Sequence, residues 1–128
     1  MKTRLAPEAT GIIIPRVGIH GPSGIVEVNM ILDTGAAYTM INRTTAEKVG
    51  YRIGHARKKV QIVTANGRIW TPFVHIQKIS LGDISASHVP AIIHDLPGII
   101  DIEGLIGLSL LKHFRTVMDY RKLTLHIG

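Results

Sequence analysis

Ile31-Leu32-Asp33-Thr34-Gly35-Ala36 is the stretch on which the interpretation of this chain depends. It ends a largely apolar run, residues 25–32, of the kind that enters a protein core, where an unpaired carboxylate would be costly. Gly35 allows the backbone to turn sharply after Asp33. The pattern predicts that a buried strand displays Asp33 on a tight loop, which suits a catalytic acid. An ordinary strand-to-turn connection would have the same composition, since Asp and Gly are common in turns.

A second motif, Leu105-Ile106-Gly107, stands late in the chain, before a short apolar helix candidate at residues 108–113. Asp-Thr-Gly-Ala after an apolar strand, together with a late apolar-apolar-Gly, resembles the retropepsin-like aspartic proteases, and specifically their cellular and bacterial branch. The resemblance extends from about residue 12 to residue 127. It implies an all-β fold, a retropepsin-like closed β-barrel with one or two short helices that assembles as a two-fold homodimer.

Length and composition predict a single domain, residues 1–128, with its core at about 11–127. A hydrophobic fraction of 45% with 19% charged residues is typical of a folded globular protein. There is no cysteine, which excludes disulfides and thiolate metal sites. The charged, proline-broken start is neither a signal peptide nor a membrane segment, so we expect a soluble cytoplasmic protein.

The charge balance is basic, with 15 Lys and Arg against 9 Asp and Glu, which would attract anionic substrates or surfaces. The densest basic stretch, residues 52–59, has no stacking aromatics beside it, so we expect a solvated edge and no nucleic-acid site. The 7 histidines are scattered without a spacing that pairs metal ligands on a helix. We therefore expect neither a metal nor another cofactor.

The order of apolar runs and turn residues predicts many short strands with brief helices, which is typical of an all-β barrel. Asn42 is placed to cap a helix that Gly50 stops. The remaining turns are predicted at residues 21–24, 81–83 and 95–98. The predicted strands are 11–17, 25–32, 59–65, 68–75, 74–81, 84–94, 115–119 and 123–127, and the predicted helices are 43–49 and 108–113.

Asn66-Gly67 separates two strand-like runs and predicts a β-hairpin, because both residues accept the positive φ of a type I′ turn. The resemblance implies that this hairpin is the flap over the substrate, although a purely structural hairpin would have the same sequence. Trp70 could pack beneath the hairpin base or line the cleft, and packing is the more common outcome. The implied flap residues are Thr64, Ala65, Asn66, Gly67 and Arg68.

Peptide hydrolysis by carboxylates needs two of them within reach of one proton. One carboxylate takes a proton from the attacking water, and the other, protonated, hydrogen-bonds the carbonyl oxygen. Only Asp33 stands in the strand-Asp-Thr-Gly context, although Asp101 and Glu103 lie close to the second motif. The economical solution is a two-fold homodimer that brings one Asp33 from each chain together.

The resemblance assigns roles to the residues of both motifs. It makes Asp33 the catalytic carboxylate, has Thr34 tie the two active-site loops together, and leaves Gly35 and Ala36 close to substrate in a crowded loop. Leu105, Ile106 and Gly107 would hold that loop rigid, and residues 123–127, or those around Leu5, could join an intermolecular sheet. The sequence departs from the retroviral pattern at two positions that would have been in contact, so the two changes are consistent with each other. Ala37 and Tyr38 replace acidic residues, and Leu108 replaces the arginine that would have been their partner.

The sequence therefore predicts an aspartic endopeptidase acting on a peptide or protein substrate. One alternative is a retropepsin-like dimerisation or peptide-binding domain with little or no proteolytic activity, because fold does not guarantee activity. A basic barrel that binds nucleic acid is a third hypothesis, under which the Asp motif is a coincidence.

Overall fold

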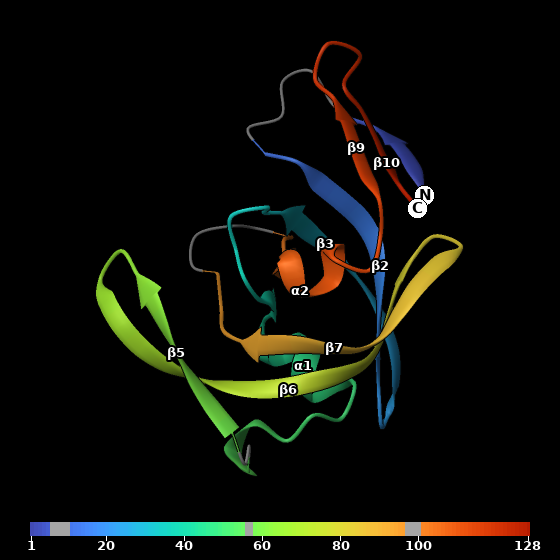
Figure 1. Ribbon diagram of the computed structural model, residues 1–128. Helices are drawn as coiled ribbons and strands as arrows, with labels where there is room; N and C mark the ends of the chain where they lie inside the picture. Colours follow the sequence, from blue (N-terminus) through green and yellow to red (C-terminus); the bar gives the residue numbers. More distant parts are fainter. Residues whose placement is uncertain (6–10, 56–57, 97–100) are drawn as a thin grey trace.

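The computed structural model describes residues 1–5, 11–55, 58–96 and 101–128 (Figure 1). Strands dominate these residues, and the helices are short. The strands are β1 (Lys2–Arg4), β2 (Ile13–Gly21), β3 (Gly24–Leu32), β4 (Thr39–Ile41), β5 (Lys58–Thr64), β6 (Gly67–Leu81), β7 (Ile84–Ile93), β8 (Gly104–Ile106), β9 (Thr116–Asp119) and β10 (Thr124–Ile127); the helices are α1 (Arg43–Lys48), α2 (Leu108–Leu111) and a 3₁₀ turn at Ile53–His55.

The main sheet closes on itself and forms a barrel. Its strand order is β2-β3-β8-β4-β7-β6-β5, and an additional pairing of β2 with β6 joins the ends of the first six strands. β5 extends the sheet beyond this closure and, with the first half of β6, projects from the barrel as a hairpin (Figure 1). The predicted all-β barrel with short helices is confirmed.

The barrel core is aliphatic and follows the alternation of the strands. On β3, for example, Val28, Met30 and Leu32 are buried while Glu27 is exposed. The helices complete this core: Ala46 of α1 and Leu110 of α2 are fully buried. Among the described residues, no helix combines the length and the hydrophobicity needed to cross a membrane.

Several predicted boundaries were wrong. The first strand continues past Val17 to Gly21, because a bulge at Arg16, with φ 54°, lets the strand bend and keep pairing with β3. The two runs 68–75 and 74–81 are one strand of 15 residues, β6, which pairs first with β5 and then with β7. The predicted helix at 108–113 ends at Leu111.

Helix α1 has the predicted limits within one residue. The Asn42 side chain accepts a hydrogen bond from the Thr45 N–H at 2.9 Å, which is the N-cap expected from the sequence. Gly50 follows the helix with φ 94°, a conformation that favours glycine. Residues 97 and 98 of the predicted turn at 95–98 lie outside the described residues. Within the described part, the Asp95 carboxylate accepts a hydrogen bond from the Arg43 N–H at 2.9 Å.

The two chain ends meet in a separate three-stranded sheet, β1-β10-β9 (Figure 1). The Met1 ammonium donates a hydrogen bond to the Ile127 carbonyl at 2.6 Å. β10 lies between β1 and β9 and has both edges paired within the chain. The expectation that residues 123–127 offer an edge to a partner chain is therefore corrected: in this sheet the outer strands are β1 and β9.

Candidate active site

Asp33 stands directly after the last residue of β3. Leu32, the residue before it, is buried, and the backbone N–H of Asp33 donates a hydrogen bond to the Ile106 carbonyl at 2.9 Å. The Asp33 side chain itself is exposed. Its Oδ1 accepts a hydrogen bond from the Gly35 N–H at 3.0 Å, and its carbonyl oxygen accepts one from the Ala36 N–H at 3.2 Å. The carboxylate is thus presented to solvent by a tight, hydrogen-bonded turn.

Strand β8 supports this turn by pairing with the strands on both sides of it. It is inserted between β3 and β4, the two strands that the Asp33 loop connects, and pairs parallel with β3 and antiparallel with β4. Gly107 follows β8 at the point where the loop crosses. A Cβ atom on Gly107 would lie 2.5 Å from the Tyr38 carbonyl oxygen and 2.7 Å from that of Ala36. The backbones touch so closely that only glycine fits there.

Two buried hydroxyl groups fasten the loop to the second motif. The Thr39 N–H donates to Ser109 Oγ at 2.8 Å, and the Gly107 N–H donates to Thr39 Oγ1 at 3.2 Å. Thr39 is fully buried and Ser109 nearly so. Neither residue was predicted from the sequence. The available signal was a hydroxyl within two apolar runs, Tyr38-Thr39-Met40-Ile41 and Leu108-Ser109-Leu110-Leu111, because a hydroxyl in a core needs a partner.

The predicted hairpin exists, but its turn differs from the predicted type I′. Thr64 pairs with Gly67, so the central residues are Ala65 and Asn66, and only Gly67, with φ 110°, has a positive φ. This pattern is typical of a turn closed by a glycine bulge. The Thr64 hydroxyl supports it by donating to the Gly67 carbonyl at 2.8 Å and accepting from the Asn66 N–H at 3.3 Å. The hydrogen-bonding capacity of Thr64 was the signal overlooked in the sequence.

A cavity of about 410 Å³ separates the Asp33 loop from the hairpin. Its walls come from three places: the loop, the middle of β5, and strands of the barrel. The predicted tip residues 64–68 do not line it, whereas the β5 residues 61–63 do, and they were missed. The lining residues are Gly35, Ala36, Ala37, Tyr38, Met40, Gln61, Ile62, Val63, Ile92 and Leu105.

An aromatic contact connects the base of the hairpin with the loop. The rings of Tyr38 and Phe73 meet edge to face with centroids 5.7 Å apart, and Lys58 Nζ lies 4.6 Å from the centroid of the Phe73 ring. Trp70 takes no part in this contact, because it is 66% exposed, so the expectation that it packs beneath the hairpin base was wrong. Phe73 has the anchoring role instead.

The two acidic residues near the second motif both contact Asn29, Glu103 through its carboxylate and Asp101 through its backbone carbonyl. The Glu103 carboxylate accepts a hydrogen bond from the Asn29 N–H at 2.8 Å, and the Asp101 carbonyl accepts one from Asn29 Nδ2 at 3.3 Å. Both contacts are with the middle of β3 and not with Asp33. Within the described part of the chain, neither residue is held as a second carboxylate beside Asp33.

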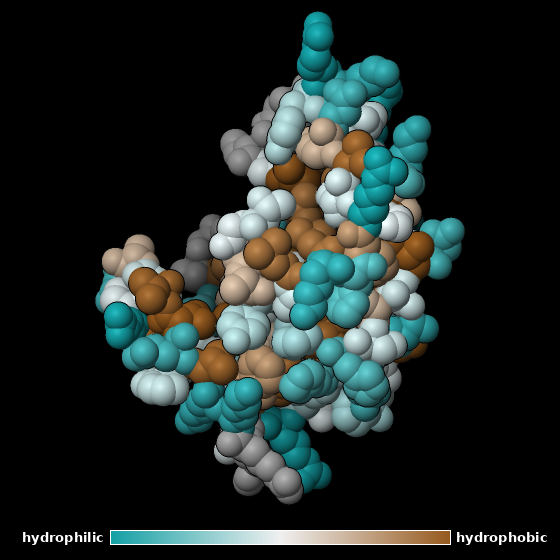
Figure 2. All heavy atoms as spheres, viewed as in Figure 1, coloured by the Kyte–Doolittle hydropathy of each residue, from teal (hydrophilic) through white to brown (hydrophobic). Residues whose placement is uncertain are grey.

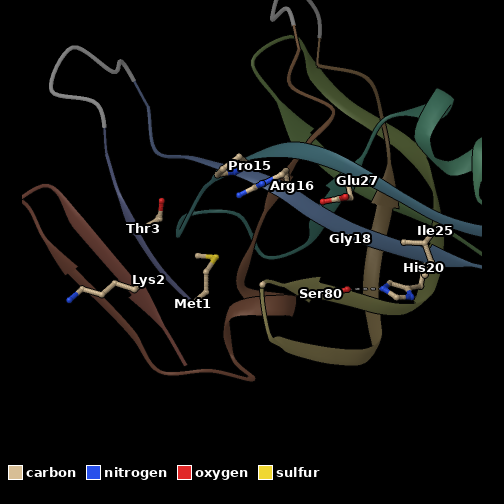
Figure 3. Close-up of a pocket in the computed structure, with 11 residues that line it drawn as sticks. Met1, Lys2, Thr3, Pro15, Arg16, Gly18, His20, Ile25, Glu27 and Ser80 are labelled. Atoms are coloured by element: carbon tan, nitrogen blue, oxygen red, sulfur yellow. Dashed lines mark hydrogen bonds between the residues drawn. The ribbon is translucent and has the colours of Figure 1, made fainter.

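A different cavity, of about 560 Å³, lies between β1 and the β2–β3 hairpin (Figure 3). At its edge His20 Nε2 and Ser80 Oγ are 2.7 Å apart, which connects β2 with β6 where the barrel closes. Burial, and secondarily the positive charge of Lys78, lowers the pKa of His20 below its ordinary value of 6.5. No acidic side chain is hydrogen-bonded to this histidine among the described residues, so the pair lacks the third member of a nucleophilic triad.

Comparison with known proteins adds two kinds of similarity. Residues 16–110 match the model of a family described as aspartyl protease. A Sinorhizobium protein described as "uncharacterized protein in cobV 5′ region" is 33% identical over 86 residues, which are 67% of this chain. The chain spans only 36% of that protein's length.

Two solved structures resemble the fold over 94% of the chain. One is a retropepsin-like aspartic protease from Rickettsia conorii, at 25% identity and a TM-score of 0.62, and 100% of that protein's chain is covered. The other is the retroviral protease-like domain of Ddi1 from Leishmania major, at 22% identity and a TM-score of 0.66, of which 90% is covered.

Proposed function

The chain belongs to the aspartyl protease family and has a retropepsin-like fold, and we propose that it is an aspartic endopeptidase whose active site contains one Asp33 from each of two copies. The observation that carries this proposal is the setting of Asp33. An exposed carboxylate stands at the end of a buried strand, on a loop held by β8, beside a cavity beneath a hairpin. Such rigid presentation is what a catalytic group needs.

The second copy supplies what one chain lacks. Two carboxylates on a two-fold axis share one proton, because like charges at short range do not both ionise. The ionised Asp33 would take a proton from water while the water oxygen attacks the peptide carbonyl carbon. The protonated Asp33 would hydrogen-bond the carbonyl oxygen as negative charge develops there. Proton transfer to the amide nitrogen would then allow the C–N bond to break.

The hairpin and the loop have supporting roles in this proposal. The cavity between them is lined mainly by apolar side chains together with Gly35 and Ala36 of the loop, which suits an extended peptide. The hairpin tip, Thr64–Arg68, would close over the peptide and exclude water. Thr34 is exposed beside Asp33 and would bond to the partner's loop, and Leu105, Ile106 and Gly107 would keep the loop in position.

Asp33→Asn tests the proposal, with Asp83→Asn as the control. The Asp33 change is nearly isosteric and removes the charge that the reaction requires, so cleavage of a peptide library should fall at least about 100-fold. Asp83 lies in the β6–β7 turn with a 91% exposed side chain, and its variant should cleave normally. Cleavage by Asp33→Asn at the wild-type rate would refute the proposal. Binding of peptides by the wild type without any cleavage would favour the peptide-binding alternative.

A further inference from the structure

The β5–β6 hairpin has two faces with different surroundings. Phe73 contacts Tyr38 of the Asp33 loop, and Thr71, two residues earlier on the same face of β6, is buried. Because side chains alternate between the two faces of a strand, Trp70 lies on the opposite face, which we call the outer face of the hairpin. The outer face consists of Lys59, Gln61, Val63, Arg68, Trp70 and Pro72.

Two apolar side chains are neighbours on the outer face. Val63 is 79% exposed and Trp70 is 66% exposed. The register pairs Trp70 with Gln61 and Arg68 with Val63, so Val63 and Trp70 are diagonal neighbours, a separation that a large aromatic side chain can span. Single exposed apolar residues are common, but this pair lies on one face of an element that projects from the barrel (Figure 1). Figure 2 shows hydrophobic and hydrophilic side chains next to one another on this hairpin, at the left of the view.

The charged residues of the hairpin are all basic. Residues 58–73 contain Lys58, Lys59 and Arg68 and neither Asp nor Glu. Lys58 Nζ lies over the Phe73 ring, on the face directed to the Asp33 loop, so Lys59 and Arg68 are the charged side chains of the outer face. The whole chain has a formal net charge of +6. The outer face is therefore suited to an anionic partner.

The dimensions of the hairpin restrict the kind of partner. Neighbouring strands lie about 5 Å apart, so one face of two strands is a narrow strip. A specific protein partner normally covers about 800 Å² of each surface, which such a strip does not offer. A lipid bilayer needs no matching shape, and its interface accepts a few apolar side chains from a protein that lies on it.

The side chains of the outer face have the chemistry of such an interface. The tryptophan ring is amphipathic and is enriched at the boundary between lipid and water, and basic side chains beside it contact anionic headgroups. A single-stranded nucleic acid could stack on Trp70, but it would leave Val63 without a role, because an aliphatic side chain offers no ring on which a base can stack. We propose that the outer face of the β5–β6 hairpin binds the surface of an anionic lipid bilayer, with Trp70 and Val63 entering the interface.

Trp70 is the only tryptophan of the chain, so its fluorescence reports on the outer face directly. Its emission should shift to shorter wavelength when vesicles of phosphatidylcholine mixed with phosphatidylglycerol are added, and brominated lipids in those vesicles should quench it. Vesicles of phosphatidylcholine alone should bind less, and added salt should weaken binding to the anionic vesicles, because it screens the basic side chains from the headgroups. Absence of binding to anionic vesicles, or binding that leaves the Trp70 emission unchanged, would overturn the proposal.

Trp70→Ser and Arg68→Gln test the outer face, with Tyr120→Ser and Arg121→Gln as matched controls. Tyr120 is 72% exposed and Arg121 is exposed, and both lie in the turn between β9 and β10. Co-sedimentation with the anionic vesicles should give a partition coefficient about fivefold lower for Trp70→Ser and about threefold lower for Arg68→Gln. Both controls should stay close to the wild type. An equal loss in the controls, or no loss in Trp70→Ser, would show that another surface binds the vesicles.

Vesicle binding is measured without cleavage, so its outcome is independent of the proposed function. Asp33→Asn should bind the anionic vesicles as the wild type does, whether or not the wild type cleaves peptides. The same fluorescence measurement with a single-stranded oligothymidylate tests the nucleic-acid alternative. A change in Trp70 emission with the oligonucleotide and none with the anionic vesicles would assign the outer face to nucleic acid and overturn the proposal.

Discussion

Gly107 is the residue on which the geometry of the Asp33 loop depends most directly. A methyl group there would lie 2.5 Å from the Tyr38 carbonyl oxygen, which is backbone and cannot swing aside. Gly107→Ala should therefore displace the loop, lower the free energy of unfolding by about 1–3 kcal/mol and reduce turnover more than tenfold.

Gly54→Ala is the matched control, because nothing lies within 4 Å of a Cβ atom added at Gly54. Thermal unfolding and steady-state kinetics of both variants measure the two effects. Equal behaviour of the two variants would show that the loop tolerates movement and that the close packing at Gly107 is unimportant.

Asp33 and Gly107 were predictable from the sequence because each has a local signature, a charge after an apolar run and a glycine after two apolar residues. Thr39 and Ser109 were not, since they bond to each other although they are 70 residues apart in the chain. A hydroxyl residue within an apolar run indicates that its side chain needs a hydrogen-bond partner, but the sequence does not indicate which residue that partner is. That information exists only once β8 is known to lie beside β4.

Among the elements, the β5–β6 hairpin is the one at which a substitution should affect catalysis with little effect on the stability of the fold. Gly67 has φ 110° and nothing within 4 Å of an added Cβ, so a side chain there meets backbone strain and no clash. Gly67→Val should cost about 1–3 kcal/mol locally and disturb the tip. Because the tip packs against little, the midpoint of chemical unfolding should shift only modestly, while kcat and substrate affinity both fall.

Ala65→Val controls for added bulk at the same tip, since Ala65 does not have a positive φ. Its kinetics should stay close to those of the wild type. Global unfolding of Gly67→Val would show that the hairpin is needed for folding. Unchanged kinetics in a folded Gly67→Val variant would show that the tip takes no part in catalysis.

Element types were predictable, and several element contacts were not. Alternation and turn residues located every strand of the barrel except the short β8 and β4, because a run of three residues has no detectable period. The prediction of a type I′ turn was wrong because Asn66-Gly67 is compatible with two turn types. The hydrogen bond of the Thr64 hydroxyl favours the turn that is observed. The parallel contacts of β8 with β3 join distant segments, which no local pattern encodes.

For the whole molecule, closure of the barrel predicts how stability responds to acid. His20 lies on the β2–β6 seam, hydrogen-bonded to Ser80, and its pKa is lowered in the folded protein. The unfolded chain therefore binds this proton more readily than the folded one does. The contribution of His20 is fully present above its ordinary pKa of 6.5 and is lost as pH falls through the lower folded value.

Urea unfolding at about pH 7.5 and about pH 5.5 measures this contribution as a difference between variants. His20→Gln should lose less stability between the two pH values than the wild type does. His126→Gln, at an exposed position on β10, should keep the wild-type difference. If His20→Gln loses as much stability between the two pH values as the wild type does, the acid sensitivity of the barrel comes from other residues.

The insertion of β8 between β3 and β4 also sets an order of events during synthesis. Asp33 leaves the ribosome before Gly104, the residue at which the strand that supports its loop begins. A nascent chain that ends before Gly104 carries the Asp-Thr-Gly loop without β8 beneath it and without Gly107 at the crossing. Contacts between such distant segments form late in folding, because a long stretch of chain must first be ordered. We therefore expect the Asp33 loop to be among the last parts of the molecule to reach its final geometry.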